Sequence, residues 1–203
     1  SIGFMMRYHP LIKKIKNIID EGLIGKIIHF SSQWGEVLRL WHPWENYQSS
    51  YAANDILGGG PTLTLSHDID LALWICNQKV KKKFINFNYG SSLNLKTHHG
   101  SDLIFKFQND TSANIHLDFY QNPPKRKIEI IGTLGRLEFD YYLSTLKCYR
   151  INSTKARSYK LYKFNRNDMF KDEIKTFLYS IKNKLEAPIP IDEALKSLKL
   201  CIR

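Results

Sequence analysis

Apolar residues recur at helical spacing in four stretches of the chain. In residues 10–21, leucine and isoleucine side chains fall on one face and lysines on the other, and Pro10 suits the first turn. The same spacing predicts a second helix over residues 61–77. Two further helices, over residues 168–184 and 192–202, are predicted to close the chain.

Between the second and third of these helices, apolar and polar residues alternate with the period of two that is typical of strands. Turn residues such as Asn, Asp, Gly and Pro separate the runs. The predicted strands are residues 84–89, 103–107, 113–120, 127–131, 136–139, 145–151 and 158–164, with an earlier strand that begins at residue 25. Sequential strands with short turns predict an antiparallel meander. The expected fold is α+β, a large, mainly antiparallel, open-faced sheet with helices packed on one face.

Residues 35–57 follow neither period, and aromatic residues are concentrated there among polar ones. A loop of this length in a compact domain is usually functional. Trp41, His42 and Tyr47 suit sugar binding, because flat rings stack on the apolar face of a pyranose while polar atoms bond its hydroxyls. The same residues could instead anchor a long loop to the sheet, and the sequence leaves both interpretations open.

The segment of residues 58–70 joins this loop to the second predicted helix and reads Gly-Gly-Gly-Pro-Thr-Leu-Thr-Leu-Ser-His-Asp-Ile-Asp. On a helix, Thr64, His67 and Asp70 share a face because they are three residues apart. A histidine near a helix N-terminus has a lowered pKa, and a neutral histidine can take the proton of an alcohol during hydride transfer. A helix-surface histidine paired with Asp68 or Asp70 is the alternative.

The glycines of residues 58–60 do not form a dinucleotide-binding fingerprint, because no G-x-G-x-x-G follows a buried strand. The sequence also lacks a P-loop, so the chain has no recognisable nucleotide site of its own. Arg7 is a further candidate site residue, since it lies at an apolar strand end just before a helix. His98 and His99 suggest a surface turn, because no cysteine or carboxylate lies at metal-ligand spacing.

The composition is that of a globular protein of 203 residues, 43% of them hydrophobic, with a mean hydropathy of −0.36. No apolar run approaches the roughly 20 residues of a membrane span, so we expect no membrane partner. The net charge is +11, but the lysines are dispersed and no stacking motif accompanies them, so we expect no nucleic-acid partner. Cys76, Cys148 and Cys201 form neither a metal pair nor a disulfide framework, which fits a reducing cytoplasm and no metal site.

Several motifs occur in a characteristic order along the chain. They are Gly-Phe-Met-Met-Arg-Tyr-His-Pro at 3–10, Glu-Gly-Leu-Ile-Gly-Lys at 21–26, Trp-His-Pro-Trp-Glu-Asn-Tyr at 41–47 with Ser-Tyr at 50–51, Leu-Gly-Gly-Gly at 57–60 with Leu-Ser-His-Asp-Ile-Asp at 65–70, and Glu-Ile-Ile-Gly-Thr-Leu-Gly at 129–135. In this order and spacing, the sequence resembles the Gfo/Idh/MocA oxidoreductase family over nearly its whole length.

The resemblance implies two domains with separate tasks. A Rossmann domain, expected before Ser1, would bind NAD or NADP and carry a catalytic lysine in a Glu-Lys-Pro motif that this sequence lacks. Residues 1–203 would be the C-terminal domain, which supplies the substrate pocket, the catalytic histidine matching His67, and an open sheet face that commonly builds dimers or tetramers. Many relatives have an aspartate at the position of Thr64, and this departure puts a carboxylate contact to a substrate hydroxyl in question.

The resemblance and the residue patterns together define an expected function. The chain would be the substrate-binding part of an NAD(P)-dependent oxidoreductase acting on a secondary alcohol of a sugar, nucleotide sugar or polyol, inactive alone and oligomeric through its sheet face. His67 is the expected acid/base. The expected substrate-binding residues are Arg7, Trp41, His42, Tyr47, Thr64 and Asp70, and those expected beside the cofactor are Gly58, Gly59 and Gly60. The alternative is a non-catalytic sugar-binding or oligomerisation module without a cofactor domain.

Overall fold

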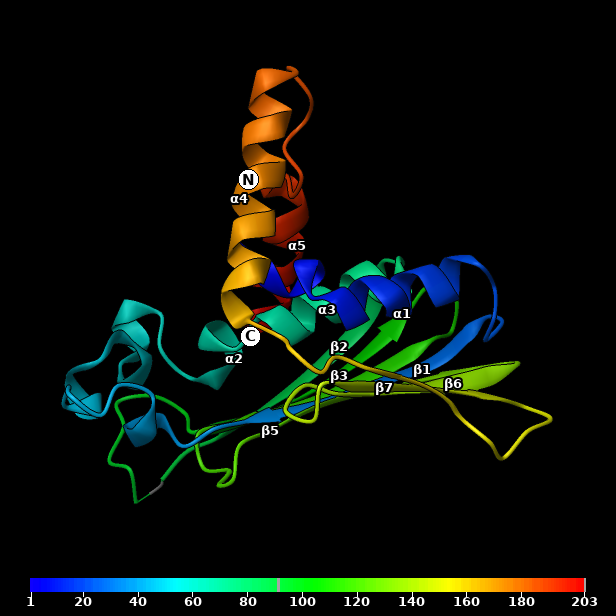
Figure 1. Cartoon of the computed structure of the whole chain (residues 1–203). Helices are drawn as coiled ribbons and strands as arrows, with labels where there is room; N and C mark the ends of the chain where they lie inside the picture. Colours follow the sequence, from blue (N-terminus) through cyan, green and yellow to red (C-terminus); the bar gives the residue numbers. More distant parts are fainter. Residues whose placement is uncertain (91, 203) are drawn as a thin grey trace.

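Among the residues that the structure describes, eight strands form one sheet, and the helices lie above one of its faces (Figure 1). The computed structural model describes residues 1–90 and 92–202. The strands are β1 (Ile27–Gly35), β2 (Val80–Asn88), β3 (Gly100–Phe107), β4 (Ser112–Asp118), β5 (Lys125–Gly132), β6 (Gly135–Asp140), β7 (Thr145–Arg150) and β8 (Arg157–Lys160). All neighbouring strands are antiparallel except β1 and β4. The predicted α+β class, with a mainly antiparallel open sheet, is confirmed.

The strand order is β2-β3-β4-β1-β5-β6-β7-β8, which corrects the predicted meander. β1 is inserted between β4 and β5 and runs parallel to β4. Strands that are neighbours in sequence usually pair, but β1 is distant in sequence from both of its partners. Its register places Gly35 opposite Asp118 of β4 and Lys125 of β5, so three strand ends meet at one end of the sheet.

The helices follow the sequence pattern with two corrections. They are η1, a short 3-10 helix (Met5–Tyr8), α1 (Pro10–Asp20), α2 (Pro61–Thr64), α3 (His67–Cys76), α4 (Arg166–Lys182) and α5 (Ile191–Cys201). The helix predicted over residues 61–77 is broken at Leu65, which is buried and leaves helical geometry at φ −107° and ψ 24°. His67 therefore begins a new helix. Arg7, expected at a strand end, lies in η1, where all four side chains are buried and do not alternate between two faces.

The aromatic loop after β1 is ordered by short 3-10 turns and extends beyond the end of the sheet (Figure 1). These turns are η2 (Leu38–Leu40), η3 (Tyr47–Ser49), η4 (Tyr51–Ala53) and η5 (Asp55–Leu57). Asn46, Ser50 and Asn54 precede the last three turns, and each side chain accepts a hydrogen bond from the N–H two residues on. The polar residues that interrupt the hydrophobic pattern therefore build the loop.

The core lies between the helices and the face of the sheet that they cover. Phe105 and Phe107 of β3 are buried and alternate with residues on the open face, as the period of two requires. Each such buried side chain contributes about 1.5–3 kcal/mol relative to leaving it exposed. In β5, Arg126 occupies the same buried row as Ile128 and Ile130. This arginine departs from the apolar pattern of the row, and it lies beside the candidate site.

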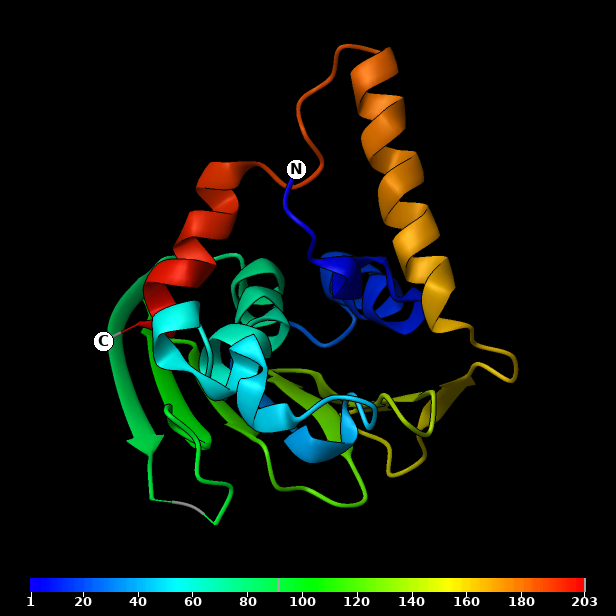
Figure 2. The same ribbon diagram turned by 90° about the vertical axis from the view of Figure 1, so that its left-hand side faces the viewer.

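Figure 2 shows α4 and α5 rising away from the sheet, joined by an extended connection. Both helices expose large apolar side chains, which are Phe170, Ile174, Phe177, Leu178, Tyr179, Ile181, Ile191, Leu195 and Leu198. An exposed apolar surface of this kind is typical of a surface that packs against another protein unit. Within the described residues, no helix has the length and apolar character of a membrane span.

Candidate functional site

A cavity of about 750 Å³ lies at the end of the sheet where β1 and β4 finish and β5 begins. Its walls come from the loop after β1, from α2 and α3, from the β4–β5 connection and from the start of α4. The aromatic residues of the lining are Trp34, Trp41, Tyr47, Tyr51, Tyr141, Tyr142 and Phe170. A concave, aromatic site of this size with a few polar groups suits a small organic ligand.

Five residues that the sequence predicted for the site line this cavity: Trp41, His42, Tyr47, Thr64 and His67. The first three belong to the aromatic loop, and the other two lie on either side of the break between α2 and α3. The fold therefore brings the two candidate segments of the sequence to one cavity.

His67 occupies the first position of α3, on the wall of the cavity. Its ring meets Phe4 edge-on at 5.8 Å between ring centres and lies 6.2 Å from the ring of Trp34. Its Nδ1 is buried and has no hydrogen-bond partner among the described residues. Burial, together with the positive charges of Arg126 and Arg166, lowers the pKa of His67 to about 3. The ring is therefore neutral near neutral pH and can accept a proton.

Asp68 and Asp70, the alternative partners of His67, are each paired with a buried arginine. Asp70 accepts hydrogen bonds from Arg7 Nε at 2.8 Å and Arg7 Nη2 at 2.6 Å. Asp68 accepts from Arg126 Nε at 3.0 Å and also from its Nη2. The two pairs tie α3 to η1 on one side and to β5 on the other, so they fix the position of His67.

Arg7 and Asp70, expected to bind substrate, lie outside the lining of the cavity in the described part of the chain. Arg7 also donates to Glu193 of α5 at 2.8 Å, and Ser197 of α5 donates to Asp70 at 3.3 Å. Arg7 instead lines a second, more open cavity between α3 and α5. These residues join η1, α3 and α5 in the interior behind the site.

The glycines of residues 58–60 give the loop before α2 its geometry. Gly58 and Gly60 have φ values of 80° and 89°, which L side chains rarely adopt, and a Cβ on Gly60 would lie 2.2 Å from the His98 ring. The N–H groups of all three glycines are hydrogen-bonded to carbonyls of the same loop at 2.8 or 2.9 Å. The Thr64 hydroxyl donates to the Gly60 carbonyl at 2.8 Å. These three amides are therefore not available to the phosphates of a dinucleotide.

The aromatic loop is anchored to the protein and also lines the cavity, so its two interpretations are compatible. Trp41 packs edge-on against Phe119 at 5.4 Å, while its buried Nε1 has no partner among the described residues. Tyr47 donates its hydroxyl proton to a backbone carbonyl at 3.2 Å. His42 stacks on Trp44 at 5.3 Å between ring centres. The indole Nε1 is therefore a buried donor that has no hydrogen-bond partner among the described residues, on a side chain that lines the cavity.

Several cavity residues were not predicted from the sequence. Glu36 accepts hydrogen bonds from Trp34 Nε1 at 2.7 Å and from the Tyr142 hydroxyl at 2.8 Å. The Arg126 guanidinium lies 3.7 Å from the centre of the Trp34 ring. Glu36 and Tyr142 are distant in sequence and meet only in the folded sheet. Arg126 did leave a signal, because a charged residue in the buried row of a strand requires a buried partner.

His98 is buried, which corrects the expected surface turn. Its ring stacks on Phe87 at 4.3 Å between ring centres, and its Nε2 lies 2.8 Å from the Thr62 hydroxyl. His98 is buried because Gly60 and Thr62, which are distant from it in sequence, lie against its ring. In the part of the chain that the structure describes, no group of three or more His, Cys, Asp or Glu side chains is placed to hold a metal ion.

The open sheet with helices over one face is an α+β fold that also occurs in solved oxidoreductase structures. The model of the GFO/IDH/MocA C-terminal domain family matches residues 12–138. Since this is more than half of the sequence, the chain belongs to that family. No curated protein matches the chain.

Solved structures share the fold at low sequence identity. Levoglucosan dehydrogenase in complex with NADH is 16% identical, with a TM-score of 0.85, and the match covers 98% of this chain and 61% of that one. UDP-N-acetylglucosamine 3-dehydrogenase GnnA from Acidithiobacillus ferrooxidans is 16% identical, with a TM-score of 0.78 and coverage of 99% and 58%. An oxidoreductase domain protein from Kribbella flavida is 15% identical, with a TM-score of 0.82 and coverage of 98% and 60%. The chain thus spans less than two thirds of each of these proteins.

Proposed function

We propose that this chain is the substrate-binding part of an NAD(P)-dependent oxidoreductase that acts on a secondary alcohol of a sugar, nucleotide sugar or polyol. The observation that carries the proposal is His67, which is neutral and has an unpartnered, buried Nδ1 on the wall of an aromatic cavity. The dehydrogenases of levoglucosan and of UDP-N-acetylglucosamine that share this fold support the substrate class.

Each part of the cavity has a role in the proposed reaction. Trp41 and Tyr47 stack on the apolar face of the sugar, and Glu36 accepts a hydrogen bond from a sugar hydroxyl. His67 takes the proton of the reacting hydroxyl, because its ring is neutral near neutral pH and therefore has a ring nitrogen with a lone pair for that proton. The chemistry that NAD or NADP would supply when bound is acceptance of the hydride from the carbon that carries this hydroxyl. Arg126 and Asp68 keep α3, and with it the base, in place.

A dinucleotide-binding domain joined to this chain is part of the proposal. The glycine loop has no free N–H group among its three glycines for the phosphates, so the dinucleotide is held elsewhere. The exposed apolar side chains of α4 and α5, such as Ile174 and Leu198, offer a surface against which such a domain packs. The solved relatives, of which the chain covers 58% to 61%, are long enough to include one.

We further infer a homo-oligomer, a dimer or a tetramer, that forms through the open face of the sheet. Phe84 of β2 and Ile104 of β3 lie opposite each other and are exposed. Polar residues of β4, such as Asn114 and His116, continue the same face. An apolar patch with a polar surround is typical of a protein–protein interface. Light scattering of the whole protein measures the oligomer size.

We also infer a cytoplasmic location. Cys76, Cys148 and Cys201 are free and buried. Proteins with free cysteines are typical of reducing compartments, where disulfides are rare.

The decisive experiment follows the absorbance of reduced nicotinamide in the protein joined to its dinucleotide-binding domain, across a panel of sugars, nucleotide sugars and polyols. At least one compound should be oxidised, and His67→Ala should lower kcat by about 10²–10⁴-fold because the base is lost. His99→Ala is the matched control, because His99 lies outside the cavity lining and should leave kcat unchanged.

Two results would contradict the proposed enzymatic function. One is the absence of oxidation with any member of the panel. The other is an unchanged kcat in His67→Ala. Sugar binding without any use of cofactor would instead favour the non-catalytic sugar-binding module, for which the aromatic wall of Trp41 and Tyr47 is sufficient.

A further inference from the structure

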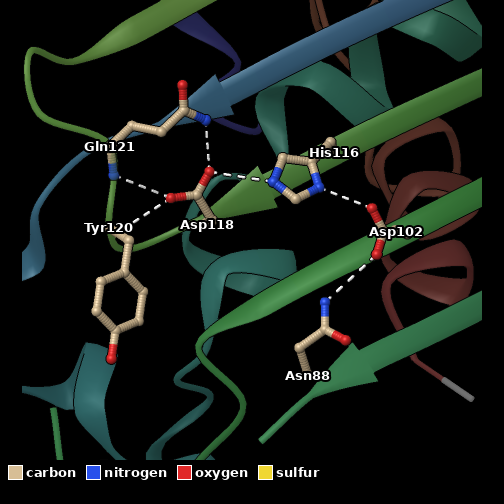
Figure 3. A network of polar contacts seen from close by, with 6 residues as sticks. All are labelled: Asn88, Asp102, His116, Asp118, Tyr120 and Gln121. Carbon is tan, nitrogen blue, oxygen red and sulfur yellow. Dashed lines mark hydrogen bonds and ion pairs between the residues drawn. The ribbon is translucent and has the colours of Figure 1, made fainter. Parts of the chain in front are cut away.

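A carboxylate at the end of β4 is saturated with hydrogen bonds (Figure 3). One oxygen of Asp118 accepts from the N–H of Tyr120 at 2.7 Å and from the N–H of Gln121 at 3.0 Å. The other oxygen accepts from the Gln121 side-chain amide at 2.5 Å and from His116 at 3.2 Å. Each oxygen therefore has two donors, which is the full capacity of a carboxylate.

This saturation fixes the orientation of the Gln121 amide. Burial alone would raise the pKa of Asp118, but the donors His116, Gln121 and Tyr120 hold it below its usual value, so the group is ionised and accepts only. Gln121 must then present its NH2 group to Asp118. Its Oε1 is turned away from Asp118 (Figure 3). Gln121 itself is part of the cavity lining.

The end of β1 leaves space for this contact. A Cβ on Gly35 would lie 2.3 Å from the carboxylate of Asp118 and 2.3 Å from the amide nitrogen of Gln121. Gly35 has no left-handed φ, so the glycine is required here for space and not for backbone torsion. The ends of β1, β4 and β5 thus leave room for the side-chain amide of Gln121 beside Asp118.

The neighbouring group in the cavity is also an acceptor. Glu36 follows Gly35 directly, and its backbone N–H donates to the Asp118 carbonyl at 3.2 Å. Its carboxylate lines the cavity, and one of its oxygens already accepts from Trp34 and Tyr142. This end of the cavity therefore offers acceptors to a ligand, and a ligand complementary to them carries hydroxyl donors.

We propose that Gln121 is a substrate-orienting residue whose Oε1 accepts a hydrogen bond from a sugar hydroxyl, and that Asp118 is the positioning residue that sets its polarity. The inference rests on the proposed function and adds to it the chemical class of the group bound here. At this position the group is a neutral hydroxyl, because Gln121 Oε1 and Glu36 are both acceptors, whereas an anionic oxygen would be matched by the arginines elsewhere in the lining, Arg126 and Arg166.

The test is a reversal of polarity in the whole protein with the panel sugar that is oxidised fastest. Asp118→Asn keeps an oxygen for the two backbone N–H groups but offers an NH2 group to Gln121, whose amide then turns its own NH2 toward the cavity. We expect KM to rise about tenfold with kcat nearly unchanged, since one neutral hydrogen bond to the ligand is lost. Adding Gln121→Glu to Asp118→Asn restores an acceptor and should bring KM back toward the original value.

The control is Asp110→Asn, the same substitution in the exposed β3–β4 turn at the other end of the sheet, which should leave KM unchanged. An Asp118→Asn protein with unchanged KM, or a double variant with no recovery, would overturn the proposal. Loss of thermal stability without a KM change would assign Asp118 a purely structural role.

A measurement without substrate separates this inference from the proposed function. In protein labelled with ¹⁵N-glutamine, one amide proton of Gln121 should exchange slowly because Asp118 accepts it, and Asp118→Asn should remove this protection. The Gln121→Glu variant assigns the signal by its loss. A rapidly exchanging Gln121 amide in the unsubstituted protein would overturn the proposal even if sugars are oxidised. A protected amide in a protein that oxidises and binds none of the sugars would instead overturn the proposed function, and the sugar contact of Gln121 with it.

Discussion

The histidines on the two sides of the sheet differ in protonation at neutral pH. Those on the side covered by helices are neutral, and the one on the open side is protonated. On the face covered by helices, the pKa values of His9 and His67 are lowered to about 3. On the open face, the pKa of His116 is raised to about 9. All three side chains have an ordinary pKa near 6.5, so the difference comes from their surroundings.

The surroundings differ in their partners as well as in their burial. His9 is fully buried, and its Nδ1 accepts the Leu11 N–H at 3.2 Å as the cap of α1, which only a neutral ring can do. His116 lies 3.2 Å from Asp118 and 2.7 Å from Asp102. The hydrogen bond to Asp118 is the largest cause of its raised pKa, and Asp102 adds to it although burial acts in the opposite direction. The contrast teaches that a carboxylate partner outweighs partial burial, whereas burial without one keeps a histidine neutral.

Ion pairs also differ between the two faces of the sheet. Replacing one partner of a buried pair gives the largest loss of stability that we expect. Asp68 and Arg126 are both buried, whereas Arg136 and Glu138 on the open face are each more than a third exposed. Asp68→Ala should lower the free energy of unfolding by about 3–5 kcal/mol, because it leaves the charge of Arg126 unpaired in the interior. Glu138→Ala should lower it by less than about 1 kcal/mol, because water screens that pair.

Chemical denaturation of the two variants at neutral pH measures both losses. A third variant, in which Asp68→Ala is combined with Arg126→Met, should recover part of the stability because no charge is left unpaired. Equal losses for Asp68→Ala and Glu138→Ala would show that the two faces do not differ in the way that their burial indicates.

The next effect is a loss of stability in acid that belongs to the covered face. The folded protein keeps His9 and His67 neutral down to about pH 3, while the unfolded chain protonates them near pH 6.5, so acid favours unfolding. Each histidine should cost about 2 kcal/mol as the pH falls from about 7.5 to about 5. Thermal and chemical unfolding across this interval measures the slope.

His9→Asn isolates one contribution, because asparagine keeps a cap acceptor for α1 but does not titrate. The variant should start from a lower stability, since it loses the ring contacts of His9 with Phe139 and Phe164, yet its stability should depend less on pH. A variant whose stability falls in acid as steeply as that of the unsubstituted protein would contradict the assignment to His9.

The difference between the two faces could be predicted from the sequence only in outline. Period-two alternation predicted the strands, and helical spacing predicted the helices, because both are local properties of the chain. The insertion of β1 between β4 and β5 could not be predicted in this way, since it depends on pairing between residues far apart in sequence. The break at Leu65 was missed because a buried apolar residue fits a continuous helix equally well.

The same limit applies to the candidate site. Trp41, Tyr47 and His67 belong to sequence segments with unusual local composition, so the sequence pointed to them. The sequence around Glu36 and Gln121 has no unusual composition. The two residues come to the same cavity only because the ends of three strands meet at Gly35. Arg7 and Asp70 looked like site residues because charge in an apolar segment signals a special role, and here that role includes a buried ion pair.

The smallest expected effect is on the open face, where the stability of the protein falls as the pH rises and not as it drops. Since the folded pKa of His116 is about 9 and the unfolded value is near 6.5, its stabilisation is complete below about pH 6.5 and is lost as the pH rises through 9. The side chain is 37% exposed, so solvent screening should limit the loss to less than about 1 kcal/mol. His116→Gln removes the titration and should make the alkaline branch of the stability curve flatter, while leaving the acid branch of His9 and His67 unchanged.

The experiment also probes the proposed oligomer, because a second copy over the open face would shield His116 from water. The alkaline loss should then grow beyond this bound and depend on protein concentration, whereas a small loss that is independent of concentration would leave the open face exposed in solution.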